Sequence, residues 1–278
     1  MAIFTNKATL SYRGVTAVSN TVTGELVGAL TLDKTALTST YTRGSGITYI
    51  ITLLNSGSSD LTGVSVSDDL GGSVRPLDYV QGSAVWFLDG VRQDSLTVTA
   101  EDGITFSGIT VPADGSSMVI YDTTVSDSAP LSVGSSIENT ATAFYGTVEA
   151  SASFTVTAAA EPQLTITKAL SPLTVTDNGE ITYTFVISNS GNLAAEEEDG
   201  AVLTDIFDPV LTDLTAALDG EELSSGDDYT YDVSTGVFST VPGVITVPAA
   251  TFETDPDGSV EVIPGTATLT VTGRIALS

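Results

Sequence analysis

The sequence predicts an all-β protein that consists of two tandem immunoglobulin-like β-sandwiches plus an N-terminal donor strand. Short segments alternate apolar and polar residues, and the composition is rich in Thr, Val and Ser, which suits half-buried strands. Turn residues such as Asn55-Ser-Gly57 and Asn189-Ser-Gly191 close these segments. Residues 21–55 match residues 155–189 without a gap, which indicates two copies of one sandwich unit.

The first predicted element, residues 1–23, repeats a segment from the middle of the chain. Its residues 6–14 are similar to residues 139–146, and both copies continue through Thr-Val-Thr into a strand that ends in lysine. We interpret residues 1–23 as a donor strand that adds to another subunit. The alternative is an ordinary edge strand that folds back onto its own first domain. Because side chains alternate along a strand, its inward face would hold Asn6 and the four anchors Phe4, Ala8, Leu10 and Tyr12.

The second predicted element is a complete sandwich, domain 1, over residues 24–159. Its strands include residues 30–34, which end in Lys34, and residues 64–68, which end in Asp68. A later strand carries Asn139. The pattern breaks at Ala-Ala-Ala-Glu-Pro162, where we place the domain boundary.

The third predicted element is domain 2, over residues 160–278. It repeats the lysine-ended strand at Lys168 and the acid-ended strand at Asp205. Residues 245–249 repeat residues 109–113, and an Asp-Gly-Ser turn follows in each copy, at Asp114 and Asp257. No counterpart of the Asn139 strand follows before Ser278, so we expect this domain to be incomplete and to be completed in trans.

The composition excludes several classes of function. A net charge of −27 disfavours binding to nucleic acid or to anionic membranes, since both would repel the chain. The absence of Cys excludes disulfides, and the absence of His removes the commonest general base and metal ligand. No segment is apolar enough to span a bilayer, and the first residues do not resemble a secretory signal. If Met1 is the initiator, this predicts that export does not use the ordinary secretory route.

Three polar residues are predicted to face the interior of domain 1. Lys34 follows Leu30 and Leu32 on one strand face, Asp68 follows Val64 and Val66, and Asn139 follows Ile137. Lys168 and Asp205 occupy the matching positions of domain 2, so we expect Lys168 to point toward the core as well. A buried ammonium is costly unless it is paired. The alternative is that both lysines bend outward at the strand ends and pair with nearby carboxylates. Asp69 is a second candidate for the role of Asp68, although alternation places it on the outward face.

These strands resemble the conserved-repeat β-sandwich family of bacterial surface proteins, known as domain of unknown function eleven. The resemblance covers residues 26–278 and depends on Leu-Thr-Ile-Thr-Lys168, on the strand and turn that end at Asn189-Ser-Gly191, on the strand that ends in Asp205, and on Glu-Asn-Thr-Ala-Thr142. Similar sandwich domains of Gram-positive surface proteins and pilins form spontaneous Lys–Asn isopeptide bonds with the help of a buried acid. The resemblance implies an intramolecular trio of Lys34, Asp68 and Asn139. It also implies an intermolecular trio in which Lys168 and Asp205 meet Asn6 of the next subunit.

Other signals are weak. The acidic runs at residues 196–199 and 226–228 lack the spacing of a known calcium loop, so we expect no metal and no cofactor. Trp86, Phe87 and Tyr79 fit a core strand better than a ligand platform.

The sequence therefore predicts a non-enzymatic structural subunit of an extracellular filament on a cell or spore surface. Its partners are identical subunits, and the sequence names no receptor. The alternative function is a monomeric surface adhesin or carbohydrate-binding module. A hydrolase is disfavoured because no His and no convincing acid pair is present.

Overall fold

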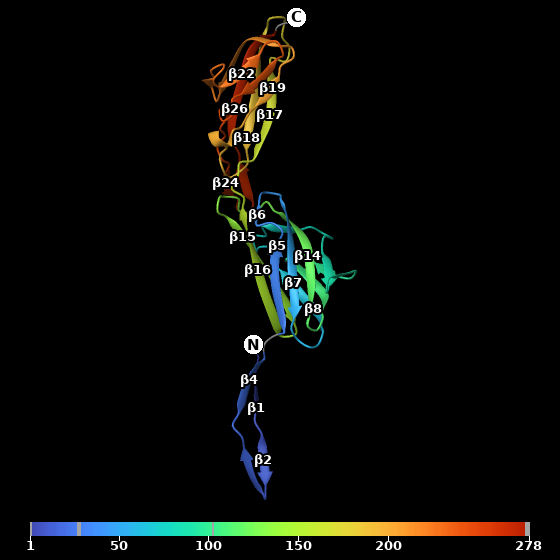
Figure 1. Ribbon diagram of the computed structural model, residues 1–278. Helices are drawn as coiled ribbons and strands as arrows, with labels where there is room; N and C mark the ends of the chain where they lie inside the picture. Colours follow the sequence, from blue (N-terminus) through green and yellow to red (C-terminus); the bar gives the residue numbers. More distant parts are fainter. Residues whose placement is uncertain (1, 27–28, 102, 276–278) are drawn as a thin grey trace. The chain divides into compact units, whose positions relative to one another are not determined.

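The computed structural model describes residues 2–26, 29–101 and 103–275 (Figure 1). Met1, the first residue of the predicted donor strand, and residues 276–278, the last of predicted domain 2, lie outside the described residues. The all-β prediction is confirmed, because the regular structure of the described residues is strands and one short 3-10 turn at Glu197–Asp199. Within these ranges, no helix is long and apolar enough to cross a membrane.

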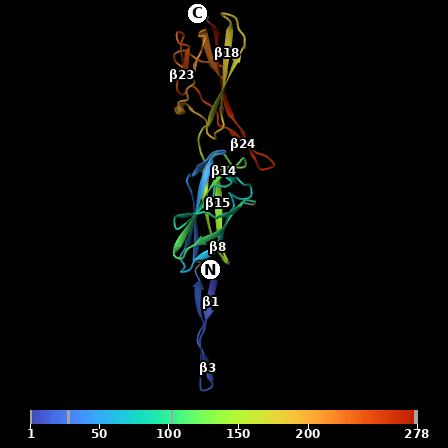
Figure 2. The same ribbon diagram turned by 90° about the vertical axis from the view of Figure 1, so that its right-hand side faces the viewer.

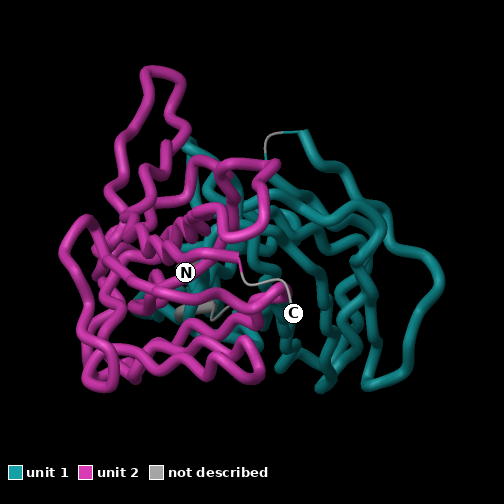
Figure 3. The backbone as a smooth tube through the Cα atoms, turned by 90° about the horizontal axis from the view of Figure 1, so that it is seen from above, with its two compact units in different colours: residues 1–126, 137–156 teal, residues 127–136, 157–278 magenta. Residues whose placement is uncertain are grey.

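The chain divides into two compact units, which Figure 3 shows in two colours. Unit 1 comprises residues 1–126 and 137–156, and unit 2 comprises residues 127–136 and 157–278. The main division after residue 156 lies near the boundary expected from the sequence. The short segment 127–136 belongs to unit 2, where Asp127 accepts a backbone hydrogen bond from Val260 and Leu131 accepts one from the Asn192 side chain.

The N-terminal segment is a β-hairpin, whereas the sequence predicted a single donor strand. Two strands run out and two run back, and they lie side by side in Figures 1 and 2. Arg13 and Gly14 form the turn with positive φ angles of 44° and 76°, as a two-residue hairpin loop requires. The ring of Phe4 lies over Gly24, where a Cβ atom would clash with it. The strands are β1 (Ala2–Asn6), which pairs with β4 (Val22–Leu26), and β2 (Thr9–Tyr12), which pairs with β3 (Val15–Val18).

Unit 1 beyond the hairpin is a sandwich of two sheets. The first sheet has the order β11-β10-β14-β7-β5, with β9 also paired to β14. The second has the order β12-β13-β8-β15-β16-β6. The strands of the first sheet are β5 (Leu30–Ala36), β7 (Gly46–Asn55), β9 (Leu77–Tyr79), β10 (Val85–Leu88), β11 (Val91–Gln93) and β14 (Gly115–Val125). The strands of the second are β6 (Thr40–Tyr41), β8 (Leu61–Asp68), β12 (Thr97–Thr99), β13 (Ile104–Val111), β15 (Ser136–Tyr145) and β16 (Val148–Ala158).

The alternating sequence of the central strands builds the core of unit 1. In β7 and β14 every second side chain is buried, because successive residues of a strand point to opposite faces. The buried residues of β7 include Ile47, Tyr49, Ile51 and Leu53. Trp86 is also buried, as the sequence indicated.

Unit 2 repeats this plan with fewer strands in its second layer. Its main sheet has the order β17-β18-β26-β20-β21, and its second sheet contains only β19-β23-β22. The strands of the main sheet are β17 (Leu164–Ser171), β18 (Glu180–Asn189), β20 (Leu211–Leu218), β21 (Glu221–Glu222) and β26 (Gly265–Ile275). The second sheet consists of β19 (Thr204–Ile206), β22 (Tyr229–Asp232) and β23 (Val237–Thr240). Its buried core includes Phe185, Phe207, Phe238, Leu269 and Val271.

The second layer of unit 2 ends at β19. In unit 1 the equivalent strand, β8, has β13 on one side and β15 on the other. In unit 2, β19 pairs with β23 and, among the described residues, has no strand on its other side. One edge of the second sheet is therefore open at the place that β15 and β16 fill in unit 1.

The predicted match between the Asp114 and Asp257 turns is wrong. Asp114 directly precedes β14, whereas Asp257 lies at the tip of an additional hairpin formed by β24 (Thr251–Thr254) and β25 (Val260–Ile263). The structural counterpart of Gly115, which pairs with Asn55, is Gly265, which pairs with Asn189. A common turn motif occurs in both places, so local sequence similarity did not give the true alignment.

We expect Ile51→Ala to lower the free energy of unfolding of unit 1 by about 2–5 kcal/mol, because it opens a cavity in the core. Leu54→Ala on the same strand should change it by less than about 0.5 kcal/mol, since Leu54 is exposed. Urea unfolding followed by the fluorescence of Trp86, the only tryptophan, reports on unit 1. Equal effects of the two substitutions would contradict the assigned faces of β7.

Candidate functional site

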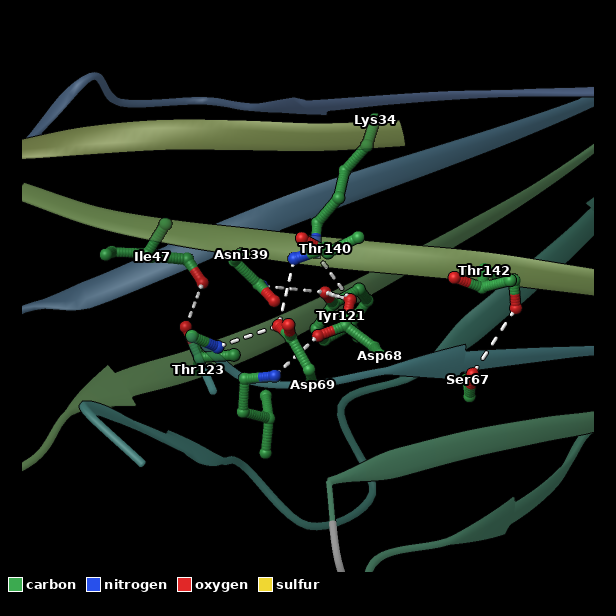
Figure 4. Close-up of polar contacts among 12 residues, drawn as sticks. Lys34, Ile47, Ser67, Asp68, Asp69, Tyr121, Thr123, Asn139, Thr140 and Thr142 are labelled. Atoms are coloured by element: carbon green, nitrogen blue, oxygen red, sulfur yellow. Dashed lines mark hydrogen bonds and ion pairs between the residues drawn. The ribbon is translucent and has the colours of Figure 1, made fainter. Parts of the chain in front are cut away.

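A fully buried ion pair connects the two sheets of unit 1. Lys34 comes from β5 of the first sheet and Asp68 from the end of β8 in the second (Figure 4). The Lys34 Nζ atom lies 2.7 Å from Asp68 Oδ2, and both side chains have 0% exposure. The strand faces predicted from the sequence are therefore confirmed for both residues. Asp68 Oδ1 also accepts a hydrogen bond from the backbone N–H of Leu70 at 3.1 Å.

Asn139 reaches the same place from β15, as the sequence predicted, and Tyr121 of β14 connects it to the ion pair. The Tyr121 hydroxyl donates a hydrogen bond to Asp68 Oδ2. The Asn139 Nδ2 group donates a hydrogen bond of 3.4 Å to the same hydroxyl. Asn139 is completely buried, and its Oδ1 atom has no hydrogen-bond partner among the described residues. The structure thus brings the whole intramolecular trio into one buried cluster.

Aromatic rings enclose this cluster. Tyr121 stacks on Tyr49 with ring centroids 5.7 Å apart and packs against Phe106 at 5.2 Å. The Lys34 ammonium lies 4.9 Å from the centroid of the Tyr49 ring. The Tyr49 hydroxyl is also buried in this cluster, beside Asn139. In such a buried apolar site, an ionised side chain costs more free energy than it does in water, so the neutral forms of titratable groups become more favourable.

Burial changes the proton affinities in this cluster. Desolvation lowers the pKa of Lys34, and the charge and hydrogen bond of Asp68 oppose this effect only in part. Desolvation also raises the pKa of Tyr121, and the negative charge of Asp68 raises it further. Lys34 is thereby shifted toward a neutral amine, which is nucleophilic, while Tyr121 keeps its proton at neutral pH.

Lys168 and Asp205 form the corresponding pair in unit 2. Lys168 pairs with Phe185 across the sheet, as Lys34 pairs with Ile51 in unit 1. Lys168 Nζ donates a hydrogen bond to Asp205 Oδ2 and lies 4.5 Å from the centroid of the Tyr183 ring. The centroids of the Phe185 and Phe207 rings lie 5.4 Å and 5.5 Å from the same Lys168 Nζ atom.

Lys168 lies against aromatic rings of unit 2, including the buried Phe207, but unlike Lys34 it is not sealed from solvent. Its side chain is 41% exposed and that of Asp205 is 19% exposed, although both lie on the predicted strands. The reason is the open edge of the second layer. In unit 1, Ala141 and Ala143 of β15 lie beside Asp68 and Val66 and help to close the core. The described residues of unit 2 include no equivalent of β15 and no equivalent of Asn139.

A groove in unit 2 follows the open edge. It has a volume of about 380 Å³. Its apolar lining includes Leu164, Ile166, Ile187, Leu203 and Ile245. Leu164 is 42% exposed, whereas its counterpart Leu30 is 4% exposed. The groove is thus a part of the sandwich interior that is covered in unit 1 and open in unit 2.

The hairpin presents complementary apolar groups to solvent. Phe4, Leu10 and Tyr12 are all more than half exposed, and Asn6 and Ala8 are exposed as well. The structure of one chain therefore brings together the intramolecular trio within unit 1 and the Lys168–Asp205 pair within unit 2.

Sequence reasoning missed Tyr121 and Tyr49 as members of the site. Their signal is present in the sequence, because both are inward-facing tyrosines of alternating strands, and they pair with each other across the sheet. In unit 2 the same pair is Tyr183 and Val271, so only one of the two tyrosines has a counterpart there. No cluster of possible metal ligands is present among the described residues, and Glu196 and Asp199 form a capping box instead.

No protein-family model matches the chain, and no curated protein matches it. Its fold is similar to that of BcpA, the major pilin subunit of Bacillus cereus, at 16% identity and a TM-score of 0.36 over 95% of this chain and 73% of that chain. It is also similar to the N-terminal domain of the Streptococcus gordonii adhesin Sgo0707, at 15% identity and a TM-score of 0.37, where it covers 52% of this chain and 36% of that chain. A third such structure is the pilus backbone RrgB of Streptococcus pneumoniae, at 12% identity and a TM-score of 0.36 over 84% of this chain and 55% of that chain. The chain spans about a third of the Sgo0707 domain and about half of RrgB.

We expect an amine-reactive acylating reagent to label Lys168 and Lys7 of the monomer but not Lys34, because access decides the reaction at a buried amine. Lys7 is exposed and serves as the internal standard. Peptide mass spectrometry after brief labelling measures the three lysines separately. Labelling of Lys34 at a rate comparable with Lys7 would contradict its burial.

Proposed function

We propose that this protein is a structural subunit of an extracellular filament, in which the hairpin of one copy fills the groove in unit 2 of the next copy. One observation carries the proposal. In unit 1, the strands β15 and β16 cover the sandwich interior, whereas unit 2 has an open groove at that place and a similar hairpin lies at the start of the chain. Residues 6–14 match β15 in sequence, residues 21–26 match the region that begins at Thr155 in β16, and residues 2–26 form a hairpin as β15 and β16 do. The groove of unit 2 lies where those two strands are found in unit 1. Docking by strand addition would pair the free edge of β19 and cover the groove.

The pairing in unit 1 gives the expected register. There, Ala141 lies opposite Asp68 and Ala143 lies opposite Val66. Transfer to the repeat places Ala8 opposite Asp205 and Leu10 opposite Leu203. Leu10 is larger than Ala143, which suits the apolar groove beside Leu203. In the same register Phe4 takes the place of Ile137, a buried residue of unit 1.

Apolar burial, preorganisation of the hairpin and charge all favour the docking of the hairpin in the groove. Burial of Phe4, Leu10 and Tyr12 would contribute roughly 1.5–3 kcal/mol each before the cost of ordering the partners. The hairpin is already folded, so it loses less conformational freedom on binding than a disordered segment would. Residues 2–26 also carry a net positive charge, because their sequence contains two basic residues, Lys7 and Arg13, and one acidic residue, Glu25, in a chain with a net charge of −27.

We further propose that two Lys–Asn isopeptide bonds lock the filament. In unit 1, the neutral Lys34 amine attacks the Asn139 carboxamide with Asp68 as the acid, and ammonia leaves. In unit 2, Lys168 and Asp205 would react in the same way with Asn6 of the neighbouring subunit, which the proposed register brings to the position of Asn139. Each reaction occurs once in each site, so the protein modifies itself and is not an enzyme. The filament would lie on a cell or spore surface.

Leu10→Glu should prevent the hairpin from docking, and Ile166→Glu should block the groove, because both place a charge in an apolar contact. Each variant alone should remain monomeric, while Leu37→Glu on an exposed loop of unit 1 should still form filaments. Electron microscopy and sedimentation measure the outcome.

A mixture of the first two variants gives a sharper test. Leu10→Glu keeps an open groove and Ile166→Glu keeps a normal hairpin, so the mixture should form one-to-one dimers and no filaments. Dispersed particles of the unmodified chain under all conditions would instead favour a monomeric adhesin. Filaments formed by the Leu10→Glu variant would show that another segment fills the groove.

Asn6→Ala should allow filaments to form but should leave them without intermolecular bonds. Boiling in denaturing detergent should then release monomers, whereas the unmodified filament should give a ladder of multimers on the gel. Asn20→Ala, on the returning arm of the hairpin, is the matched control and should keep the ladder. A single monomer band from the unmodified filament would refute the intermolecular cross-link.

A further inference from the structure

Tyr121 contacts both the acid and the leaving group of the proposed reaction in unit 1. Its hydroxyl donates to Asp68 Oδ2 and accepts from Asn139 Nδ2, the nitrogen that must depart as ammonia (Figure 4). The Asn139 Nδ2 group donates this hydrogen bond to the Tyr121 hydroxyl over 3.4 Å. A carboxamide nitrogen is a poor leaving group unless it is protonated as the C–N bond breaks. The site therefore needs a route that brings a proton to Nδ2.

We propose that Tyr121 is a catalytic residue of unit 1 that relays a proton from Asp68 to the departing Asn139 nitrogen. This inference rests on the proposed Lys34–Asn139 bond and names the group that makes its last step possible. The contacts in the structure place the hydroxyl oxygen between the proton source and the proton acceptor.

The proton balance of the reaction closes with these groups alone. Lys34 first gives a proton to Asp68 Oδ2, which lies 2.7 Å from Nζ, and the free amine then attacks Asn139 Cγ. As the tetrahedral intermediate collapses, Asp68 passes its proton to the Tyr121 oxygen while Tyr121 passes its own proton to Nδ2. The C–N bond breaks and ammonia leaves. Asp68 takes up the surplus proton from the new amide nitrogen, so the products are one amide bond, one ammonia and one protonated acid.

The surroundings of Tyr121 suit a group that passes protons on rather than a general base that removes them. Its pKa is raised by burial and by the charge of Asp68, so the hydroxyl holds its proton until another one replaces it. The stacked Tyr49 ring and the tilted Phe106 ring hold the phenol in place. A fixed donor with no water around it is the arrangement that general acid catalysis requires.

Unit 2 lacks this group. Tyr183 faces Val271 across the sheet, where Tyr49 faces Tyr121 in unit 1. Lys168 and Asp205 therefore have no tyrosine at the matching position. The intramolecular bond of unit 1 should form faster than the bond between subunits, so that unit 1 is locked before the filament is.

The test follows bond formation in newly synthesised full-length chain by pulse labelling and intact mass, with the loss of one ammonia as the signal. Tyr121→Phe should slow the reaction of unit 1 by about 10²-fold or more. Tyr79→Phe is the matched control, because its ring packs near Tyr121 but its hydroxyl accepts from the backbone N–H of Ala84. This control should react at the normal rate.

A second variant separates chemistry from packing. Tyr121→Ala leaves a cavity between the Tyr49 and Phe106 rings that small aromatic molecules can enter, and a hydroxyl can again meet Asp68 and Asn139 there, so added phenol should restore the reaction and added benzene should not. Equal rescue by both molecules, or a normal rate in Tyr121→Phe, would overturn the relay while leaving the Lys34–Asn139 bond intact. If the unmodified chain loses no ammonia, the bond itself is refuted, and the relay with it.

Discussion

Each sheet of a β-sandwich must cover its apolar face with a second layer, and this constraint decides how the two units of the chain differ. In unit 1 the layer that contains β8 continues through β15 and β16, and residues such as Leu30 are buried. In unit 2 the layer stops at β19 within the described residues, and Leu164 is exposed at the matching position. The presence or absence of this second layer also decides the exposure of the two lysines. The Lys34 side chain is fully buried, whereas the Lys168 side chain is 41% exposed.

Burial also changes the chemistry of the Lys34–Asp68 ion pair, because it lowers the pKa of the lysine. An exposed Lys–Asp pair keeps its charges and contributes little to stability. Inside unit 1, desolvation lowers the pKa of Lys34 and so favours the neutral amine, which lies in the same cluster as the completely buried Asn139 carboxamide. If the hairpin docks as proposed, the Lys168 pair acquires these conditions only in the assembled state. Reactivity would then depend on assembly, which suits a bond whose purpose is to fix a contact already made.

The sequence predicted the structure correctly wherever a local pattern is compatible with a single arrangement of the chain. Alternation on the strands that end in Lys34 and Asp68 placed both side chains inside, and the tertiary structure agrees. Repetition of Asn139 as Asn6 identified the N-terminal segment as a copy of an internal one. Local similarity failed at the Asp257 turn, because an Asp-Gly-Ser turn fits the tip of an inserted hairpin as well as the start of β14.

Strand periodicity, the repeat and the positions of the lysines were thus determined by the sequence alone, since each depends on neighbours along the chain. The pairing of residues 2–26 into a hairpin, the exposure of Lys168 and the place of Tyr121 between Asp68 and Asn139 were decided only by the tertiary structure. The physical reason is that each of these depends on which strands lie side by side. Hydrogen bonding and packing across the sheets set the register of strands that are distant in sequence and decide which residues they bury. No local sequence pattern contains that information.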